Sequence, residues 1–396
     1  MRTVRLGDIV AIQLGKMLSP ASKTGLRPMP YLRNANVQWD RFDLTDVHEM
    51  DFDIREEQKF LLKPGDVLVC EGGEPGRAAV WTGAIDPCLY QKALHRLRPI
   101  SDAVDPQYLV YRLWHAAHRG ELGDGQAKST IAHLPAVRLA ELLVRIPKIG
   151  EQRRIAARLT AQIAAIDQLR RDVRRRRAAC DALVIQLVRS TISRNQESTT
   201  AKLSGVAEMR RSPSVTSDGD VIVRTVTSGC LTPTGFSTAG FSTRRMTADA
   251  AVLGVVNAGE VLVARSNTEE LVGRAALYPG GSEGVVASDL IFRIAPDPAR
   301  LMPEFLAHHL AGLQLSGYWR NRSSGASSTM KKITKTLLWD LDIPIPPLEE
   351  QLQITEELQV RLASIDAMKS AIRAEQEAID ALPAALLRLA FEGLAA

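Results

Sequence analysis

Apolar residues recur every seven positions along two long stretches of the chain, with mostly polar residues between them. The first series is Leu159, Ile166, Val173, Cys180 and Leu187, and the second is Leu358, Ile365, Ile372, Ile379 and Leu386. Companions at a second heptad position are Ile155, Leu169 and Leu183, and Ile354, Met368, Leu382 and Leu389. Such a narrow seam is typical of coiled coils. It predicts two long helices, each about 40 residues and ~60 Å long.

Shorter apolar runs, punctuated by glycine and proline, fill the rest of the chain. Strands are predicted at DVLVC (66–70), AAVW (78–81), DVIVRTV (220–226) and EVLVA (260–264). Amphipathic helices are predicted near 105–118 and 302–314, each introduced by a proline. Each of these regions is therefore a mixed domain, and the predicted fold class is α+β.

Several phrases of the sequence occur twice at a nearly constant spacing. VRIPKIGEQRRI near the middle of the chain matches IPIPPLEEQLQI near its end, so that Pro147 falls on Pro346 and Gln152 on Gln351. GDVLV and GRAA in the first half face GEVLV and GRAA in the second. The chain is therefore predicted to be two tandem copies of one unit of about 195 residues, related by an internal pseudo-twofold repeat.

The repeat suggests the following division of the chain. Mixed domains are predicted at 1–145 and 196–344, each followed by a long helix, at 146–195 and 345–396. Pro383 lies in the second helix, where a missing backbone donor is expected to kink it or mark its last regular turn.

Charge distinguishes the two predicted helices. Between 151 and 177 arginines outnumber acids, whereas between 349 and 380 acids outnumber basic residues. Because flanking charges select coiled-coil partners, we predict that the helices pair within the chain as an antiparallel coiled coil, with one mixed domain at each end. The run RRDVRRRR can also contact nucleic-acid phosphates. Both roles can hold, since only part of the run can face the acidic helix.

Composition narrows the class of protein further. The net charge is a mild +5. The chain shows no apolar run near the ~20 residues that span a bilayer, and its first residues lack a signal-peptide core. Its cysteines lack a CxxC pair, so neither a zinc site nor a disulfide framework is indicated: Cys70, Cys88, Cys180 and Cys230. We expect a cytoplasmic protein without membrane contact.

Motifs for catalysis are nearly absent. We find no GxxxxGK[ST] loop, no GxGxxG after a strand, no GxSxG elbow and no Asn-Pro-Pro-aromatic loop of the amino-methyltransferases. A loose group of carboxylates beside a lysine could in principle hold a hard metal ion: Asp51, Asp53, Glu57, Gln58 and Lys59. It has no counterpart in the second copy, and chance explains it more readily. Histidines such as His115 and His309 are expected to be ordinary helix residues.

The repeated proline phrases, the GDVLV and GEVLV strands, and the order domain, helix, domain, helix resemble the DNA-specificity subunit of type I restriction-modification systems. The resemblance covers the whole chain and is most specific at IPIPPLEEQLQI. In the mid-chain copy, Lys148 and Gly150 replace the second proline and an acid.

The resemblance implies that each mixed region is a target recognition domain reading one half of a bipartite, asymmetric target in double-stranded DNA. The helices would serve as a spacer and as the dock for two methyltransferase subunits, which would methylate adenine. Two restriction and translocase subunits would join them where the system also restricts DNA.

The resemblance also implies a non-catalytic chain that binds no metal and no cofactor. S-adenosylmethionine would be bound by the partner subunits, as would ATP and Mg²⁺ in a restricting complex. Two alternatives are a coiled-coil interaction scaffold that does not read DNA, and an autonomous nuclease or methyltransferase. A salt-dependent DNA affinity would exclude the scaffold.

Polar side chains in loops or beside strand ends are the candidates for DNA contact, because arginine and amide groups read base edges and cations bind phosphates. In the first domain they are Lys23, Arg27, Arg33, Asn34, Asn36, Arg77, Gln91, Lys92 and Lys128. In the second they are Arg224, Thr225, Arg244, Arg245, Arg265, Asn267, Arg274, Lys331 and Lys332. A solvated charge or a structural hydrogen bond is an equal alternative for each. Recognition loops are expected where the copies diverge, at 13–38 and 210–245.

Overall fold

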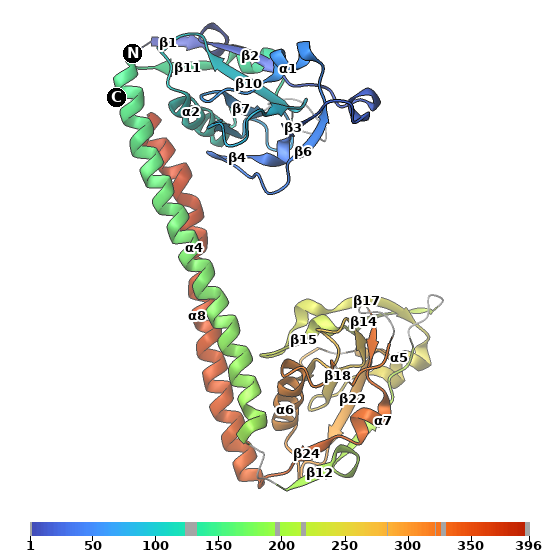
Figure 1. The fold of residues 1–396 in the computed structure, drawn as a ribbon. Coiled ribbons are helices and arrows are strands. Elements are labelled where there is room, and N and C mark those ends of the chain that lie inside the picture. Colours follow the sequence, from blue (N-terminus) through green and yellow to red (C-terminus); the bar gives the residue numbers. More distant parts are fainter. Residues whose placement is uncertain are drawn as a thin grey trace. The chain divides into compact units, whose positions relative to one another are not determined.

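A computed structural model describes residues 2–122, 133–194, 199–214, 219–282, 284–320, 322–325 and 330–392. The chain divides into two compact units. Unit 1 comprises Met1–Asp172 and Gln376–Ala396, and unit 2 comprises Val173–Glu375. Each unit therefore contains one mixed domain and part of each long helix (Figure 1).

Unit 1 is built on an antiparallel four-stranded sheet. Its strands, in spatial order, are β2 (Val10–Leu14), β10 (Leu94–Pro99), β7 (Val67–Cys70) and β8 (Ala78–Val80). A second sheet contains β6 (His48–Asp51), β3 (Pro28–Leu32) and β9 (Leu89–Tyr90), with β3 parallel to β9. The smaller pairs are β1 (Arg2–Arg5) with β11 (Leu143–Ile146) and β4 (Val37–Gln38) with β5 (Arg41–Phe42).

Unit 2 repeats these four sheets and adds one further strand pair. Its four-stranded sheet contains β13 (Ala207–Arg210), β22 (Ile291–Pro296), β18 (Val261–Ala264) and β20 (Ala275–Leu277). Its three-stranded sheet contains β17 (Ser242–Met246), β14 (Val221–Val226) and β21 (Val285–Ala287), again with one parallel pair. The remaining pairs are β12 (Thr200–Lys202) with β24 (Asp342–Pro344), β15 (Leu231–Thr232) with β16 (Gly235–Phe236), and β19 (Ser266–Asn267) with β23 (Lys331–Lys332).

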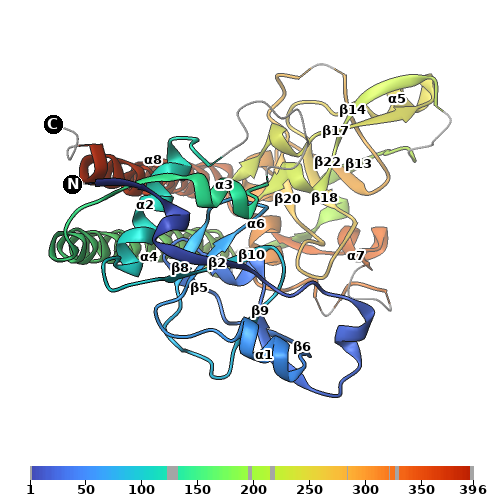
Figure 2. The same cartoon turned by 90° about the horizontal axis from the view of Figure 1, so that it is seen from above.

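The short helices also correspond between the units. In unit 1 they are α1 (Ile54–Phe60), α2 (Pro106–His118) and α3 (Ala136–Glu141), and in unit 2 they are α5 (Ala248–Gly254), α6 (Pro303–Leu315) and α7 (Lys335–Trp339). Single 3-10 turns occupy Leu6–Asp8, Pro20–Lys23, Asn34–Asn36, Leu203–Gly205, Ser228–Cys230 and Thr238–Gly240. Figure 2 shows α5 beside β14 and β17, where Ala250 and Ala251 pack against Met246. The four strands and the two helices beginning with proline that the sequence predicts are confirmed, and so is the internal repeat.

Two of the repeated phrases have a direct structural cause. The first residue of GRAA is a glycine with positive φ in both copies, +91° at Gly76 and +80° at Gly273. A Cβ atom would lie 2.2 Å from Leu122 Cδ1 in unit 1 and 2.2 Å from Trp319 Cδ1 in unit 2. Only glycine tolerates both the dihedral angle and the close approach. The strand phrases GDVLV and GEVLV recur because β7 and β18 are buried along their whole length.

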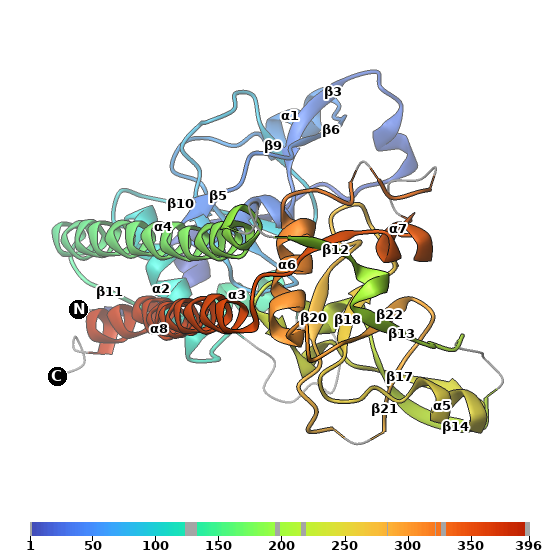
Figure 3. The same ribbon diagram turned by 90° about the horizontal axis from the view of Figure 1, so that it is seen from below.

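The long helices are α4 (Ile149–Arg194) and α8 (Leu348–Glu392), and they run side by side (Figures 1 and 3). Within unit 2, Arg176 pairs with Glu375 at 2.7 Å and Asp181 with Lys369 at 2.6 Å. Within unit 1, Arg170 Nε donates to Asp380 Oδ1 at 2.8 Å. As residue numbers rise along α4 they fall along α8, which confirms the predicted antiparallel coiled coil.

The seam agrees with the heptad series only in part. Its main series is buried except for Leu187 and Leu386, which are half-buried. The predicted companion position is wrong over most of the seam, because its members are exposed: Leu169, Leu183, Met368, Leu382 and Leu389. The buried companions follow the main series by four residues rather than three, as at Ile163, Val184 and Leu362. At this heptad position α4 carries Arg170 and α8 carries Lys369, and both are paired with acids. Because these residues are charged, a search for apolar residues did not identify the position as part of the seam.

Pro383 does not end α8, so that part of its expected effect is wrong. The helix continues to Glu392, and the turns beyond the proline bury Leu387 and Phe391 in the core of unit 1. That core also receives Leu159 and Ile163 from α4 and Tyr108 from α2. The burial of these apolar side chains outweighs the missing hydrogen bond at the proline.

Candidate nucleic-acid interface

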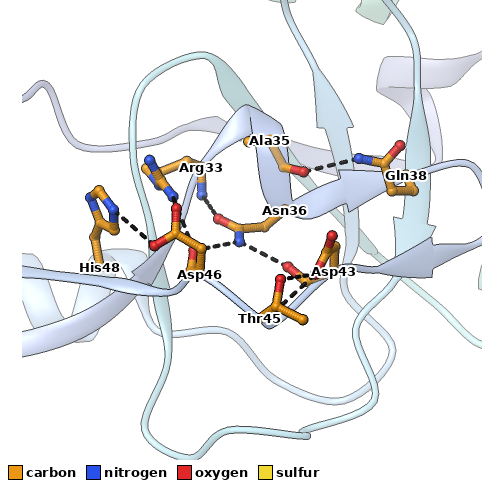
Figure 4. Close-up of polar contacts among 8 residues, drawn as sticks. All are labelled: Arg33, Ala35, Asn36, Gln38, Asp43, Thr45, Asp46 and His48. Carbon is orange, nitrogen blue, oxygen red and sulfur yellow. Dashed lines mark hydrogen bonds and ion pairs between the residues drawn. The ribbon is translucent and has the colours of Figure 1, made fainter. Parts of the chain in front are cut away.

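Asn36 organises the turn that follows β3 (Figure 4). Its side chain is 2% exposed; its Oδ1 accepts from the backbone N–H of Arg33 at 2.8 Å. Its Nδ2 donates to the carbonyl oxygens of Asp43, at 2.8 Å, and Asp46, at 3.0 Å. The Arg33 guanidinium donates to the Asp46 carboxylate at 2.6 Å, and this hydrogen bond lowers the pKa of Asp46. In the free protein, both predicted DNA contacts therefore hold the loop together.

Arg77 and Asn34 are also engaged within unit 1. Arg77 Nη2 donates to the Asn34 carbonyl at 2.9 Å, and Arg77 Nη1 lies 3.3 Å from Glu74 Oε2. Asn34 Nδ2 donates to the Gly72 carbonyl at 2.6 Å. Arg27 forms an ion pair with Glu57 at 2.8 Å. The pairing of Glu74 with Arg77 has a local spacing of three residues. Helix α1 brings Glu57 to Arg27 from 30 residues away, and local spacing does not reveal that pair.

Gln91 and Lys92 are the predicted contacts of the first domain whose side chains stay available. Gln91 is half-buried and Lys92 is exposed. Both follow β9, in a segment whose backbone is bound to Lys16 and Leu32. Neither side chain has a hydrogen-bond partner in the part of the chain that the structure describes. Lys128 and the side chain of Lys23 lie outside the described residues.

Five of the nine predicted residues in unit 2 are likewise engaged. Thr225 is buried and donates to the Ser242 carbonyl at 3.0 Å, and Asn267 Nδ2 donates to Ser228 Oγ at 2.5 Å. The engaged basic side chains donate to backbone carbonyls: Arg245 to Gly219, Arg265 to Asp289 and Lys331 to Gly325. These contacts leave Arg224, Arg244, Arg274 and Lys332 as the more available donors. Of these, Arg224 lies over the Phe241 ring at 5.6 Å.

Arg274 shows how the two copies differ at one equivalent position. It follows Gly273 as Arg77 follows Gly76, but Leu271 stands where unit 1 has Glu74. Burial lowers the pKa of Arg274, and within the described ranges of the chain no acidic partner counteracts this effect. A half-buried guanidinium without a carboxylate partner is better able to bind an external acceptor than one that is already paired.

A cleft of about 860 Å³ borders the divergent segment 13–38 in unit 1. It lies between the end of β2 and helix α1, and its lining includes the basic residues Lys16, Arg27, Arg55 and Lys59. Acidic Asp51, Asp53 and Glu56 share this lining. Side chains of both charge signs stand beside apolar ones in this lining, so the cleft is not a purely electrostatic patch.

The acids of this cleft are used by the fold. The Asp51 carboxylate accepts from Thr24 Oγ1, Gly25 N and Arg27 N, each at 2.7 Å, and the hydrogen bond from Thr24 contributes most to its lowered pKa. Asp53 caps α1 by accepting from Arg55 N and Glu56 N. Across residues 2–392, outside the gaps noted above, no three His, Cys, Asp or Glu side chains are grouped so that they could hold a metal ion. The loose carboxylate group is thus accounted for by structural contacts.

The histidines and cysteines behave as interior residues. His115 and His309 are buried on α2 and α6, as expected of helix residues, and burial lowers the pKa of His309 to about 4. All the cysteines are buried as free thiols, and desolvation raises the pKa of Cys70 to about 11. A buried, protonated thiol is a poor nucleophile. In the described part of the chain, no helix is long and apolar enough to cross a membrane.

Two units of closely similar topology, joined to paired long helices and displaying available cations, suit a two-domain nucleic-acid-binding protein. The model of the type I restriction modification DNA specificity domain matches residues 1–173 and 254–377. The chain belongs to this family. A curated relative, the type I restriction enzyme StySPI specificity subunit of Salmonella potsdam, is 22% identical over 396 residues, covering 92% of this chain and 82% of the relative.

Solved structures show the same fold. One, from work on assembly and conformational transition of a type I restriction-modification system, has a TM-score of 0.73 at 16% identity and covers 98% of this chain and 97% of its own. Another, the HsdS subunit of Thermoanaerobacter tengcongensis, has a TM-score of 0.55 at 16% identity, covering 99% and 96%. The protein is a type I specificity subunit. Such a subunit is non-catalytic, and the chemistry of the complex lies in partner subunits.

Proposed function

We propose that this chain reads a bipartite, asymmetric target in double-stranded DNA, with the mixed domain of each unit reading one half. The observation that supports the proposal is that the units share four corresponding sheets and three short α-helices while their polar groups differ. Arg77 is paired with Glu74, for example, whereas its counterpart Arg274 has no acidic partner among the described residues. One framework with two sets of donors and acceptors can read two different sequences.

The paired helices would serve as the spacer and as the dock for two methyltransferase subunits. Their outward faces expose large apolar side chains, including Leu169, Val360 at 67%, Met368 and Leu389 at 75%. These exposed apolar side chains would support contacts with partner subunits. A repeated unit offers two equivalent surfaces of this kind to two identical partners.

The partners would supply the reaction that this chain directs. S-adenosylmethionine would be bound by the methyltransferase subunits, which would modify an adenine turned out of the duplex into their own pocket. ATP and Mg²⁺ would be bound by restriction and translocase subunits where the system restricts DNA. The complex would act in the cytoplasm, where its DNA substrate lies.

A segment swap tests whether the divergent loops carry sequence preference. Residues 13–38 would be replaced by the corresponding segment of a specificity subunit with another target, and the modified sites mapped after co-expression with the methyltransferase subunit. We expect the first half-site to change and the second half-site to stay the same, because 13–38 borders only the cleft of unit 1. An unchanged first half-site in an active complex would refute this assignment. A swap within 210–245 is the matched control and should change only the second half-site.

A further inference from the structure

A buried glutamine joins the start of α4 to the mixed domain of unit 1. Gln152 lies in the first turn of the helix and its side chain is 0% exposed. Its Oε1 accepts from the Asp105 backbone N–H at 3.0 Å. Its Nε2 donates to the carbonyls of Ala103 and Pro147, each at 2.9 Å. One amide therefore connects the loop that leads into α2 with the junction between β11 and α4.

Gln351 makes the same contacts in unit 2. Its side chain is also 0% exposed, and its Oε1 accepts from the Met302 backbone N–H at 2.8 Å. Its Nε2 donates to the carbonyls of Arg300, at 2.9 Å, and Pro346, at 2.8 Å. The loop leading into α6 is thereby tied to the junction between β24 and α8. The phrase with proline and glutamine recurs in the sequence because this connection recurs in the structure.

This connection contributes stability and also fixes the direction in which each long helix leaves its mixed domain. The glutamine uses both amide protons and its oxygen on backbone groups of two separate segments, so the first helical turn cannot rotate against the loop without breaking several hydrogen bonds. A buried backbone group left unpaired is destabilising, so these hydrogen bonds resist such a rotation. In unit 1, Tyr108 of α2 strengthens the same junction by donating to the Arg145 carbonyl at 2.8 Å. The planar amide is thus placed to set how each long helix leaves its own mixed domain.

We propose that Gln152 and Gln351 are positioning residues for the gap between the two half-sites. The inference rests on the proposed bipartite reading. In such a reader the number of base pairs between half-sites depends on the direction in which each spacer helix leaves its domain, since half-site spacing is a geometric quantity. Neither glutamine needs to touch DNA for this role. Loosening either one should relax the gap and leave the half-site sequences unchanged.

The test uses the full chain co-expressed with its methyltransferase subunit. Gln152→Met and Gln351→Met keep the side-chain length and remove every hydrogen bond of the amide. Q152N and Q351N provide a milder form of the same change for a complex that does not tolerate methionine. Thr355→Val is the matched control, because Thr355 is 3% exposed and its hydroxyl donates only to the Gln351 carbonyl within α8, at 2.8 Å. This control loses a buried hydrogen bond without loosening the junction.

Modified adenines would be mapped across the host genome for each complex that co-purifies with its partner. We expect methylation at sites whose gap is one base pair longer or shorter to rise about fivefold in each glutamine variant, which corresponds to about 1 kcal/mol of lost discrimination. T355V should keep the wild-type gap. Gaps that stay fixed in the assembled glutamine variants, or that broaden equally in T355V, would overturn the inference. A wild-type methylome without a split motif would instead overturn the proposed function, and the inference with it.

Discussion

Replacing Arg293 with methionine is expected to lower the free energy of unfolding of unit 2 by about 4 kcal/mol, because it leaves a buried carboxylate without a partner. Arg293 is 3% exposed; its Nε lies 2.7 Å from Oε2 of Glu260, which is 4% exposed. Its guanidinium also donates to the carbonyls of Arg211, Leu253 and Val255. Methionine fills the space but serves none of these acceptors.

Hydrogen exchange of the full chain, followed by mass spectrometry, measures this loss locally. Peptides from β18 and β22 should exchange about a thousandfold faster, and peptides from unit 1 should be unaffected. The matched control is Arg96→Met, because Arg96 opposes Leu68 in β7 as Arg293 opposes Leu262 in β18. Arg96 has no carboxylate partner in the part of the chain that the structure covers, and it donates to the carbonyls of Lys59 and Leu61, so we expect a loss of only about 1 kcal/mol. Equal losses at the two sites would contradict the assigned role of the buried pair.

Replacing Phe391 with alanine is expected to destabilise unit 1 by about 3 kcal/mol, although the residue lies almost at the other end of the sequence. Phe391 is 8% exposed, and its ring centroid lies 5.6 Å from that of Tyr108 and 5.3 Å from that of His115. The next residue, Glu392, pairs with Arg119 at 2.9 Å. The last turns of α8 are therefore part of the core of unit 1.

Leu389→Ala is the matched control for this prediction. Leu389 lies two residues earlier on the same helix and is 75% exposed, so its truncation should change stability by no more than about 0.5 kcal/mol. Amide exchange in α2 reports the effect, with about a hundredfold acceleration expected for Phe391→Ala. If exchange in α2 were the same in both variants, the end of α8 would not belong to the core.

The sequence predicted the architecture because the architecture is repeated and periodic. The heptad series located α4 and α8, opposite charges indicated their pairing, and the matched phrases revealed two copies of one unit. The side of the seam that becomes buried was harder to predict. It carries Arg170 and Lys369, whose alkyl stems can pack while their charges pair with acids across the seam, and an apolar pattern does not register such residues. Met368 and Leu382 are apolar but exposed, so the apolar pattern placed them in the seam although they lie outside it.

The candidate interface was less predictable, since residue type does not reveal whether a polar group is already engaged. Asn36 and Arg33 suit base reading by type, yet the structure places both in the hydrogen-bond network of their own loop. The partner Asp46 joins them only through the turn after β5. Gln152 and Gln351 were visible as a repeated pair, but sequence could not say which backbone groups they bind. Small helices such as α1 and α5 were missed because seven residues carry too little periodicity.

The central claim is that two copies of one domain read the two halves of a split DNA target. The most direct measurement is to co-express the wild-type chain with its methyltransferase subunit and map modified adenines across the host genome by single-molecule sequencing. We expect one motif made of two different half-sites separated by a constant number of unspecified base pairs. A continuous motif, or no motif from an assembled and active complex, would contradict it.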